Sequence, residues 1–304
     1  MQTETLAIVR PPTTGDQNLA SRLSKGFRDA SRRVAVYSSP EVSALAPDDL
    51  GNTTLVVVSP GQCIETSGNE GAFLSKVARA RKRILASVGP VHSQGYLSRL
   101  RRGIHFDALF DLGFVSQRDS HYKVTNLAYH FVFNGLTREE VPLAEEPANR
   151  EERTIPWVLV GPRSDRNRDL LGALFEHQVD PGGFCLLHAR QKNTTTPPEP
   201  TLGGPQLSAI LSKAKYYLWG AEREGMYYES FRFIVALLAG TVPCKIDPAL
   251  AAVGFEVPGV YASVSAFDTE VRNMGYSEMY RRASDFYVFR GRLGKHLSGA
   301  LRFV

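Results

Sequence analysis

A stretch in the last third of the sequence, residues 213–246, constrains the fold more than any other part. Lys215–Trp219 is short and rich in aromatic residues, which is typical of a β-strand. Glu229–Ala239 is apolar on almost every side, so a helix formed by it must be covered on most of its surface. Gly240 ends that helix, and Val242–Ile246 resumes as a strand. The stretch therefore predicts a strand, a loop, a buried helix and a second strand, as in an α/β domain.

The start of this helix is a predicted ligand-binding position. A helix N-terminus carries unpaired backbone N–H groups and a partial positive charge, and it therefore attracts anions. Glu229 at this position would repel a phosphate, but its carboxylate can accept hydrogen bonds from sugar or ribose hydroxyls. The alternative is that Glu229 only caps the helix, and the residues alone leave both interpretations open.

The segment Tyr228–Pro243, YESFRFIVALLAGTVP, resembles the donor-site segment of GT-B glycosyltransferases. The resemblance is to the spore-maturation-type family first, and more distantly to fucosyltransferase and exostosin catalytic domains. In the spore-maturation-type and exostosin families an Arg opens the helix, and a Glu three residues later commonly holds the ribose of the nucleotide. Arg232 stands at the position of that Arg, whereas Val235 stands at the position of the Glu. Either Glu229 has taken over this contact or the nucleotide is held differently.

The first 136 residues also alternate between apolar runs and helical segments. Thr54–Ser59 is a continuous, mostly β-branched run, which is the pattern of a strand buried on both faces of a parallel sheet. Residues 137–154 break this pattern, because they carry six glutamates and two prolines. Ile155–Gly161 then opens a second α/β unit.

These observations predict the α/β fold class, with two Rossmann-like doubly wound domains facing a central cleft in the GT-B arrangement. The N-terminal domain would span residues 1–136, and a linker of residues 137–154 would join it to a C-terminal domain of residues 155–304. A length of 304 residues fits two domains of about 150 residues each. The resemblance, which covers roughly Trp157–Phe267, implies that the first domain holds the acceptor and the second the nucleotide-sugar donor. It also implies that C-terminal helices cross back to the first domain.

The composition is that of an ordinary globular protein, with 43 % apolar and 22 % charged residues. No apolar run reaches the roughly 18 residues that a transmembrane helix needs. The first ten residues lack the basic flank and long apolar core of a signal peptide. Cys63, Cys185 and Cys244 lie far apart and fit buried thiols in a reducing compartment. We therefore expect a cytoplasmic protein with no transmembrane segment and no bound metal.

Sugar transfer from a nucleotide diphosphate requires positive charge near the departing pyrophosphate. Loops expected at the carboxyl ends of the strands in the second domain supply the candidates, because ligands bind there in doubly wound sheets. The expected donor-binding residues are Arg163, Arg190, Lys192, Gly225, Tyr227, Tyr228, Glu229, Ser230 and Arg232. The candidates for the pyrophosphate are Arg163, Arg168, Arg190, Lys192 and Arg232. The alternative for Arg163 is a solvated loop position, and for Arg168 an ion-paired surface group. Tyr227 and Tyr228 either stack on the base or sugar, or pack against the helix.

Inverting enzymes also need a general base for the acceptor hydroxyl. His92 is the first candidate, because it follows a buried strand and histidine titrates near neutrality. Asp16 and Glu65 lie in predicted loops after other strands and are rivals, and the alternative for His92 is an ordinary surface histidine. The sequence has no Asp-x-Asp triplet of the metal-dependent GT-A kind, so we expect a metal-independent enzyme. P-loop and Gly-x-Ser-x-Gly motifs are also missing, which gives no support to a P-loop kinase or a nucleophile-elbow hydrolase.

Positive charge is concentrated in the first domain. Between Gly71 and Phe106 there are eight basic residues and no acidic one, in a chain of net charge +5. Such a tract can bind an anionic partner, for example DNA or another anionic polymer. The expected contacts are Arg79, Arg81, Lys82, Arg83, Arg99, Arg101 and Arg102. The commoner alternative is a solvated surface without a ligand.

Two functions from different classes follow. The first is a glycosyltransferase that moves a sugar from a nucleotide-diphosphate donor to a saccharide, a protein or a modified base in DNA. The second is a non-catalytic nucleotide- or polyanion-binding protein on the same scaffold, with Val235 marking a lost nucleotide contact.

Overall fold

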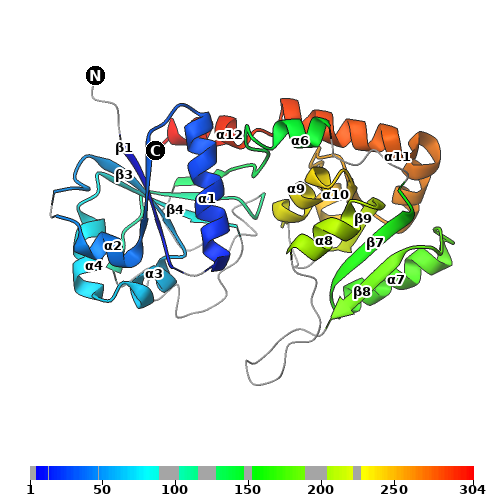
Figure 1. Cartoon of the computed structure of the whole chain (residues 1–304), viewed down its shortest axis with the longest axis horizontal. Coiled ribbons are helices and arrows are strands. Elements are labelled where there is room, and N and C mark those ends of the chain that lie inside the picture. Colours follow the sequence, from blue (N-terminus) through cyan, green and yellow to red (C-terminus); the bar gives the residue numbers. More distant parts are fainter. Residues whose placement is uncertain are drawn as a thin grey trace. The chain divides into compact units, whose positions relative to one another are not determined.

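The computed structural model describes residues 5–12, 14–46, 48–88, 103–115, 128–146, 153–188, 204–221 and 227–304, without the side chains of residues 14–18. The chain divides into two compact units, whose elements Figure 1 labels. The first unit combines Met1–Arg138 with Gly291–Val304, and the second unit is Glu139–Arg290.

The first unit is built on a parallel sheet. Its strands in the described residues are β1 (Thr5–Arg10), β2 (Val34–Ser38), β3 (Thr53–Val58), β4 (Lys82–Ser87), β5 (Ala108–Asp111) and β6 (Ala128–Phe131), in the order β2-β1-β3-β4-β5-β6. Its helices in the same residues are α1 (Thr14–Asp29), α2 (Ser39–Ala44), α3 (Pro60–Thr66), α4 (Glu70–Ala78) and α12 (Leu293–Leu301).

Helices cover both faces of this sheet. Alternate residues of each strand point to opposite faces, so the continuous apolar run of β3 supplies two separate cores. Val56 and Val58 pack with α1 and α12, whereas Leu55 and Val57 pack with α2, α3 and α4. Figure 1 shows the same division of the helices between the two faces. The doubly wound arrangement expected for this part of the chain is thus present.

The second unit is built on another parallel sheet. Its strands in the described residues are β7 (Ile155–Pro162), β8 (Phe184–His188), β9 (Ala214–Gly220), β10 (Val242–Ile246) and β11 (Val260–Tyr261), in the order β11-β10-β9-β7-β8. Its helices in the same residues are α6 (Val141–Glu145), α7 (Asp165–Glu176), α8 (Gly204–Leu211), α9 (Ser230–Leu238), α10 (Pro248–Ala252) and α11 (Val264–Phe289). The strand–helix–strand unit predicted from the sequence corresponds to β9, α9 and β10. The predicted α/β fold class is therefore confirmed.

The unit boundaries differ from the expected ones at both ends. Helix α6 lies inside the expected linker but is packed into the second unit, because the carbonyl of Ala144 accepts hydrogen bonds from Tyr280 Oη and Ser284 Oγ, each at 2.8 Å. Helix α12, one of the C-terminal helices for which a return to the first domain was expected, packs against α1 of the first unit. Its Leu293 and Leu297 are fully buried in the core of the first unit.

Three local predictions were wrong. Asp16 was expected in a loop, but it lies in the first turn of α1. The segment after β3 was expected to be a loop, but Pro60–Thr66 forms α3, whose first residue is a proline with a backbone angle compatible with a helix start. The helix packs Cys63 and Ile64 against the sheet. Cys185 was expected to be buried, but it is exposed, because β8 is an edge strand of the second sheet. Cys63 and Cys244 are buried free thiols as expected.

Among the described helices, none combines the length and the apolar character that a membrane span requires.

His130 on β6 gives the first unit a predicted pH dependence. Its ring lies 5.9 Å from the ring of Phe110 and 6.0 Å from that of Phe303, measured between centroids. Burial lowers the pKa of His130, so the folded state binds this proton less readily than the unfolded state does. Below the pKa of the unfolded state, protonation of His130 favours the unfolded chain. The free energy of unfolding is therefore expected to fall as the pH drops through about 6.5.

We expect His130→Phe to lose less unfolding free energy than the wild type between pH 7.5 and pH 5. Denaturant unfolding of both proteins at several pH values measures this difference. Only the change with pH is compared, so a constant offset between the proteins does not matter. Parallel pH profiles would contradict the prediction.

Candidate functional site

The strand order of the second sheet places a ligand-binding position at the ends of β7 and β9. The chain goes from β7 to β8 on one side, and then returns to β9 on the other side of β7. Ligands of doubly wound sheets bind at the carboxyl ends of the two strands where the order reverses. A cavity of about 250 Å³ occupies this position. Its described lining residues are Pro162, Arg163, Ser164, Asp165, Asn167, Arg168, Gly220 and Arg232.

The N-terminus of α7 contributes to the wall of this cavity. Ser164 caps the helix, and its Oγ accepts a hydrogen bond from the backbone N–H of Asn167 at 3.3 Å. The buried Asn167 amide donates to the carbonyl of Pro162 at 2.8 Å, which ties the helix to the end of β7. Gly161 permits this approach, because a Cβ there would lie 2.8 Å from Asn167 Nδ2. The first turn of α7 thus places its partial positive charge beside the cavity.

Arg232, in the first turn of α9, brings a guanidinium group to the same cavity. Its Nη1 donates to the carbonyl of Val160 at 3.0 Å and to Tyr217 Oη at 2.7 Å. Its Nε lies 3.5 Å from Glu229 Oε1, and 24 % of the side chain remains exposed. The result is a planar cation fixed at the cavity, which suits recognition of a phosphate.

The cavity has a positive balance of charge. Of the described residues that line it, three are arginines and one is an aspartate. Asp165 is paired with Arg168, and both of these side chains are largely exposed. Arg163 is exposed and donates from Nε to the carbonyl of Leu187 at 3.0 Å. The volume is below the roughly 300–1,000 Å³ of typical ligand pockets, so the cavity suits an anionic part of a larger ligand.

A second cavity adjoins the first and has a different lining. Its volume is about 560 Å³, and the two cavities share Gly220. Most of its lining residues are apolar: Leu170, Ala173, Ala221, Ile246, Pro248, Ala249 and Val264. An apolar hollow beside a cationic one suits a ligand that has a flat uncharged part and an anionic part.

Glu229 lies at the start of α9, but its carboxylate is not turned out to solvent. The residue is the N-cap of the helix, with backbone angles φ 56° and ψ 42°, and its side chain is 3 % exposed. Its Oε2 accepts a hydrogen bond from Trp219 Nε1 at 3.3 Å and lies 3.1 Å from Lys245 Nζ. The expected hydrogen bond between Glu229 and a donor hydroxyl stays a prediction.

The neighbours of Glu229 take different positions. Tyr228 is fully buried, with its ring centroid 4.8 Å from that of Phe233 and 5.1 Å from that of Phe255. It therefore packs in the core instead of stacking on a ligand. Tyr227 is half-buried, and its carbonyl accepts a hydrogen bond from Lys245. Ser230 is buried at the first position of α9.

The remaining expected site residues lie either outside the described residues or in the first unit. Arg190, Lys192, Gly225 and His92 lie outside the described residues. Asp16 lies in the first turn of α1, after β1, and its side chain is not described. Glu65 is exposed near the end of α3, after β3. β1 and β3 flank the reversal of strand order in the first sheet, so both acids follow the strands at its own ligand-binding position.

The described part of the basic tract, residues 79–83, lies at the opposite end of the strands of the first sheet. Lys82 begins β4, so the residues around it stand at the amino ends of the strands. Arg79 is paired with Asp48 at 3.3 Å and Arg83 with Asp107 at 3.5 Å, and Lys82 donates to the carbonyl of Val304. Arg81 is exposed, whereas Arg99, Arg101 and Arg102 lie outside the described residues. An anion held by Arg79 and Arg81 would therefore lie away from the carboxyl ends of these strands.

Sequence reasoning missed several residues that organise the cavity. Ser164 had a recognisable signal, since a serine followed by an acidic residue before an apolar periodicity is typical of a helix N-cap. Tyr217 had no such signal, because its hydroxyl is bonded to Arg232 on another element. The bond of Asn167 to the Pro162 carbonyl is local, but it depends on the shape of the turn between β7 and α7, which the sequence does not reveal. Lys245 had a weak signal, namely a charged residue inside an apolar strand with Asp247 two residues later.

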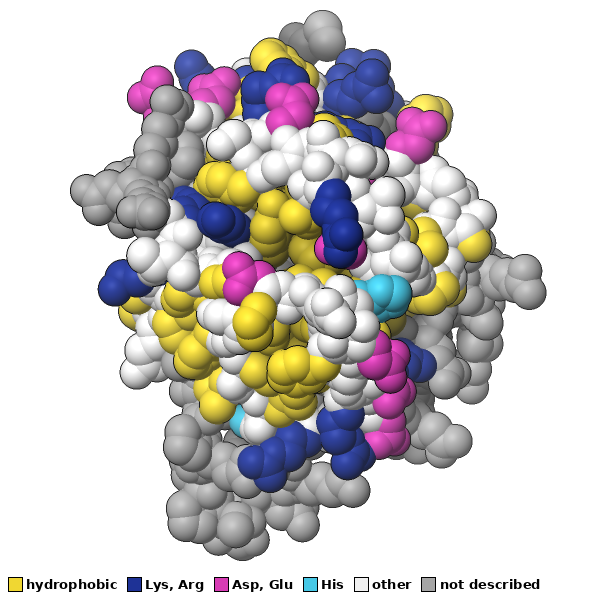
Figure 2. Space-filling model, turned by 90° about the vertical axis from the view of Figure 1, so that its right-hand side faces the viewer, with side chains coloured by type: hydrophobic (Ala, Val, Ile, Leu, Met, Phe, Trp, Pro, Cys, Tyr) yellow, Lys and Arg dark blue, Asp and Glu magenta, His cyan; other side chains and the backbone are white. Residues whose placement is uncertain are grey.

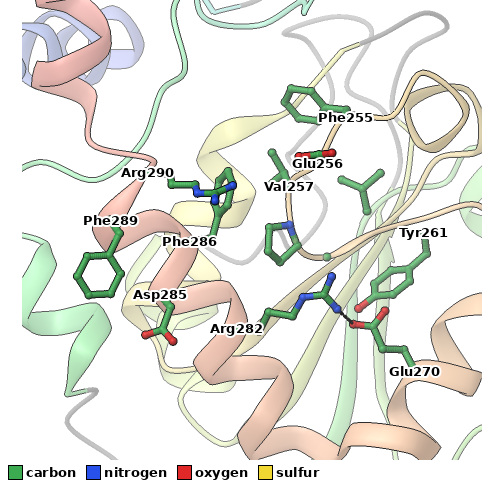
Figure 3. A pocket seen from close by; sticks show the side chains of 13 residues that line it. Phe255, Glu256, Val257, Tyr261, Glu270, Arg282, Asp285, Phe286, Phe289 and Arg290 are labelled. Carbon is green, nitrogen blue, oxygen red and sulfur yellow. Dashed lines mark hydrogen bonds and ion pairs between the residues drawn. The ribbon is translucent and has the colours of Figure 1, made fainter.

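A third cavity in the second unit, of about 650 Å³, does not share these features (Figure 3). It lies between the segment before β11 and α11, where Arg282 and Glu270 form an ion pair at 3.0 Å. Phe289 on its rim is 71 % exposed. On the face shown in Figure 2, hydrophobic side chains gather near the middle. Exposed apolar side chains are common on folded proteins, so they do not select a site by themselves.

Comparison with known proteins supports the fold assignment. No protein-family model and no curated protein matches the sequence. Among solved structures, an alpha-glucosyltransferase in complex with UDP-glucose and DNA containing an abasic site is similar, with a TM-score of 0.62 and 10 % identity over 98 % of each chain.

Two further solved structures are more distant. One is an alpha1,3-fucosyltransferase, with a TM-score of 0.38 and 12 % identity over 98 % of this chain and 88 % of the other. The second is a glycotransferase of kitacinnamycin, with a TM-score of 0.41 and 14 % identity over 99 % and 95 %. The resemblance to the spore-maturation-type family stays a prediction. The chain has the α/β fold with two parallel sheets of the GT-B glycosyltransferases.

Proposed function

We propose that the protein is a glycosyltransferase that takes a sugar from a nucleotide-diphosphate donor. The observation that carries the proposal is the arginine-lined cavity at the reversal of strand order between β7 and β9. The alpha-glucosyltransferase of similar fold is described with UDP-glucose bound, which supports a nucleotide sugar as the donor here. The diphosphate would occupy the cationic cavity, and the nucleoside would occupy the adjoining apolar one.

The chemistry assigned to these residues is charge stabilisation. As the acceptor hydroxyl attacks the anomeric carbon, the bond to the diphosphate breaks and its electrons leave with the phosphate oxygen. Arg232 and Arg163 would bind the negative charge that develops there, with help from the N-terminus of α7. This assignment supplies the positive charge without a catalytic metal. Asp16, Glu65 and His92 remain the candidates for the base that takes the proton of the hydroxyl.

A nucleotide panel tests the donor part of the proposal. Each of UDP, GDP, ADP, TDP and CMP is added to the protein, and thermal unfolding is followed. The nucleotide of the donor is expected to stabilise the folded protein by about 2.7 kcal/mol at a concentration 100 times its dissociation constant. Arg163→Ala is expected to reduce that shift without lowering stability, because Arg163 is exposed. A panel without any shift would contradict a nucleotide-sugar donor.

Binding without turnover would favour the second candidate function, a non-catalytic nucleotide-binding protein. The specific observation in its favour is Val235, which stands at the position of a Glu in the spore-maturation-type and exostosin families that the segment resembles. Release of the nucleotide diphosphate from a sugar donor, with and without an acceptor, separates the two functions.

We further propose DNA as the first acceptor to test. Support comes from the similar alpha-glucosyltransferase that is described in complex with DNA. The basic tract would hold the phosphate backbone of the duplex at the amino ends of the strands, away from the reacting hydroxyl. Each phosphate contact contributes about 0.9 to the slope of log affinity against log salt, so we expect a slope of about −3 or steeper for duplex DNA.

Arg79→Glu with Arg81→Glu is expected to flatten that slope, because both side chains are exposed. Arg272→Glu with Arg281→Glu, two exposed positions of the second unit, serves as the matched control. No binding at low salt would exclude DNA and leave a saccharide or a protein as the acceptor, without affecting the donor proposal.

A further inference from the structure

Lys245 is a fully buried cation at the edge of the candidate site. Its side chain is 0 % exposed, and Nζ lies 3.1 Å from Glu229 Oε2 and 2.8 Å from Asp247 Oδ2. It also donates a hydrogen bond to the carbonyl of Tyr227. Burying a charge is costly unless it is paired and hydrogen-bonded, and both carboxylates here are buried as well. The group is therefore an internal ionic cluster and not a chance surface contact.

The cluster fixes the turn that leads into α9. Glu229 adopts a left-handed backbone conformation that non-glycine residues rarely take, so surrounding contacts must hold it there. Lys245 supplies two of these contacts, one through the Glu229 carboxylate and one through the carbonyl of Tyr227. Asp247, the third member, caps α10 through Oδ1, which accepts from the backbone N–H of Leu250 at 3.0 Å. Lys245 thus anchors the starts of two helices at the carboxyl edge of the sheet.

The cluster also reaches the cationic cavity. The two carboxylate oxygens of Glu229 face different cations, with Oε2 toward Lys245 and Oε1 toward Arg232 Nε. Lys245 shares its positive charge between Asp247 and Glu229. It therefore compensates part of the charge of Glu229, and Arg232 does not have to neutralise this carboxylate alone. The guanidinium can then keep its bonds to the Val160 carbonyl and Tyr217 Oη, which hold it at the cavity wall.

We propose that Lys245 is a positioning residue for the diphosphate site. It compensates part of the charge of Glu229 and fixes the Tyr227–Glu229 turn, and Arg232 is thereby available to an anion in the cavity. The assignment rests on the proposed donor site. It also gives Glu229 a role through Arg232, in place of a direct contact with the donor.

The test compares UDP binding by titration calorimetry in folded variants. Lys245→Met is expected to weaken UDP binding by about tenfold or more, because Glu229 then competes with the ligand for Arg232. Adding Glu229→Gln to Lys245→Met is expected to restore part of the affinity, since it removes the competing charge. A purely structural role of Lys245 predicts no rescue, so an equal or larger loss in the double variant overturns the proposal.

Arg153→Met is the matched control. Arg153 is also a buried cation of the second unit, but it binds backbone carbonyls at the other end of α9, including that of Ala239 at 3.0 Å. Its loss is expected to lower stability while leaving the affinity of the folded protein for UDP within about twofold. If Arg153→Met lost as much affinity for UDP as Lys245→Met, the loss would reflect general loosening of the second unit. That result would overturn the proposal.

Two further arms keep the proposal testable. If Lys245→Met does not fold, Glu229→Gln alone decides the question. This variant is expected to keep its affinity for UDP within about threefold of the wild type. A loss of tenfold or more would mean that Glu229 itself contacts the donor, and would overturn the proposal. If the wild type binds no nucleotide, the proposed function fails, and amide hydrogen exchange tests the positioning role alone. In that case Lys245→Met is expected to speed amide exchange at residues 228–232, whereas Arg153→Met is expected to speed it at residues 238–241. The same exchange pattern in both variants would overturn the assignment.

Discussion

Replacing Arg232 with alanine is expected to lower turnover by about 10²–10³-fold, which corresponds to about 2.7–4 kcal/mol of transition-state stabilisation. The guanidinium is held by Val160, Tyr217 and Glu229, so it is in place before the reaction begins. The diphosphate gains negative charge as the sugar leaves, and a preorganised cation therefore binds the transition state more strongly than the ground state. Steady-state kinetics with the nucleotide sugar identified by the panel measures the effect, which should fall on kcat more than on KM.

Arg281→Ala provides the control for this substitution. Arg281 is an exposed arginine of the same unit, paired with Glu278 and Asp285 on one helix, and its loss should leave turnover unchanged. Unfolding measurements on both variants separate lost chemistry from lost folded protein. Wild-type kcat in Arg232→Ala, with a lower unfolding free energy, would show that Arg232 serves packing and not catalysis.

Leu297→Ala is expected to lower the unfolding free energy of the first unit by about 2–5 kcal/mol. Leu297 on α12 is fully buried in the core that also contains α1 and one face of the first sheet. The helices approach so closely that a Cβ at Gly26 would lie 2.7 Å from Leu297 Cδ1. Close packing of this kind leaves a cavity when the side chain is shortened, because the surroundings relax only partly.

Denaturant unfolding measures the loss, followed with probes in each unit because a chain with two units need not unfold in one transition. Leu143→Ala makes the same chemical change at a position that is 52 % exposed, and it should stay within about 0.5 kcal/mol of the wild type. Equal effects of the two substitutions would mean that α12 contributes little to the core.

The parts of the fold that the sequence predicted are those with a strong local pattern. The β-branched apolar run around Val56 predicted a strand buried on both faces and corresponds to β3, and the apolar helix at residues 229–239 matches α9 within one residue at each end. Pro60 shows the limit of such reasoning, because a proline after a strand opens a loop or a helix equally well. The short helix α3 depends on packing of Cys63 and Ile64 against the sheet, which the local sequence does not reveal.

The candidate site was predicted in part for the same reason. Arg163 and Arg232 were expected near one another from their places after a strand and at a helix start, and the structure brings both to one cavity. The environment of Glu229 was not predictable, because it depends on a left-handed turn and on a lysine from the next strand. Tyr228 was open to two interpretations, and burial decided for packing.

The assignment of residues 291–304 to the first unit has a consequence for synthesis of the protein. The ribosome makes the whole of the second unit, residues 139–290, before it makes the helix that completes the first. Until then Leu23, Phe27 and the neighbouring strand residues lack their partners Leu293 and Leu297. The unit that is translated first is therefore completed last, the reverse of the usual order for chains whose domains are contiguous. A nascent chain halted before residue 291 would present that uncovered apolar face to chaperones.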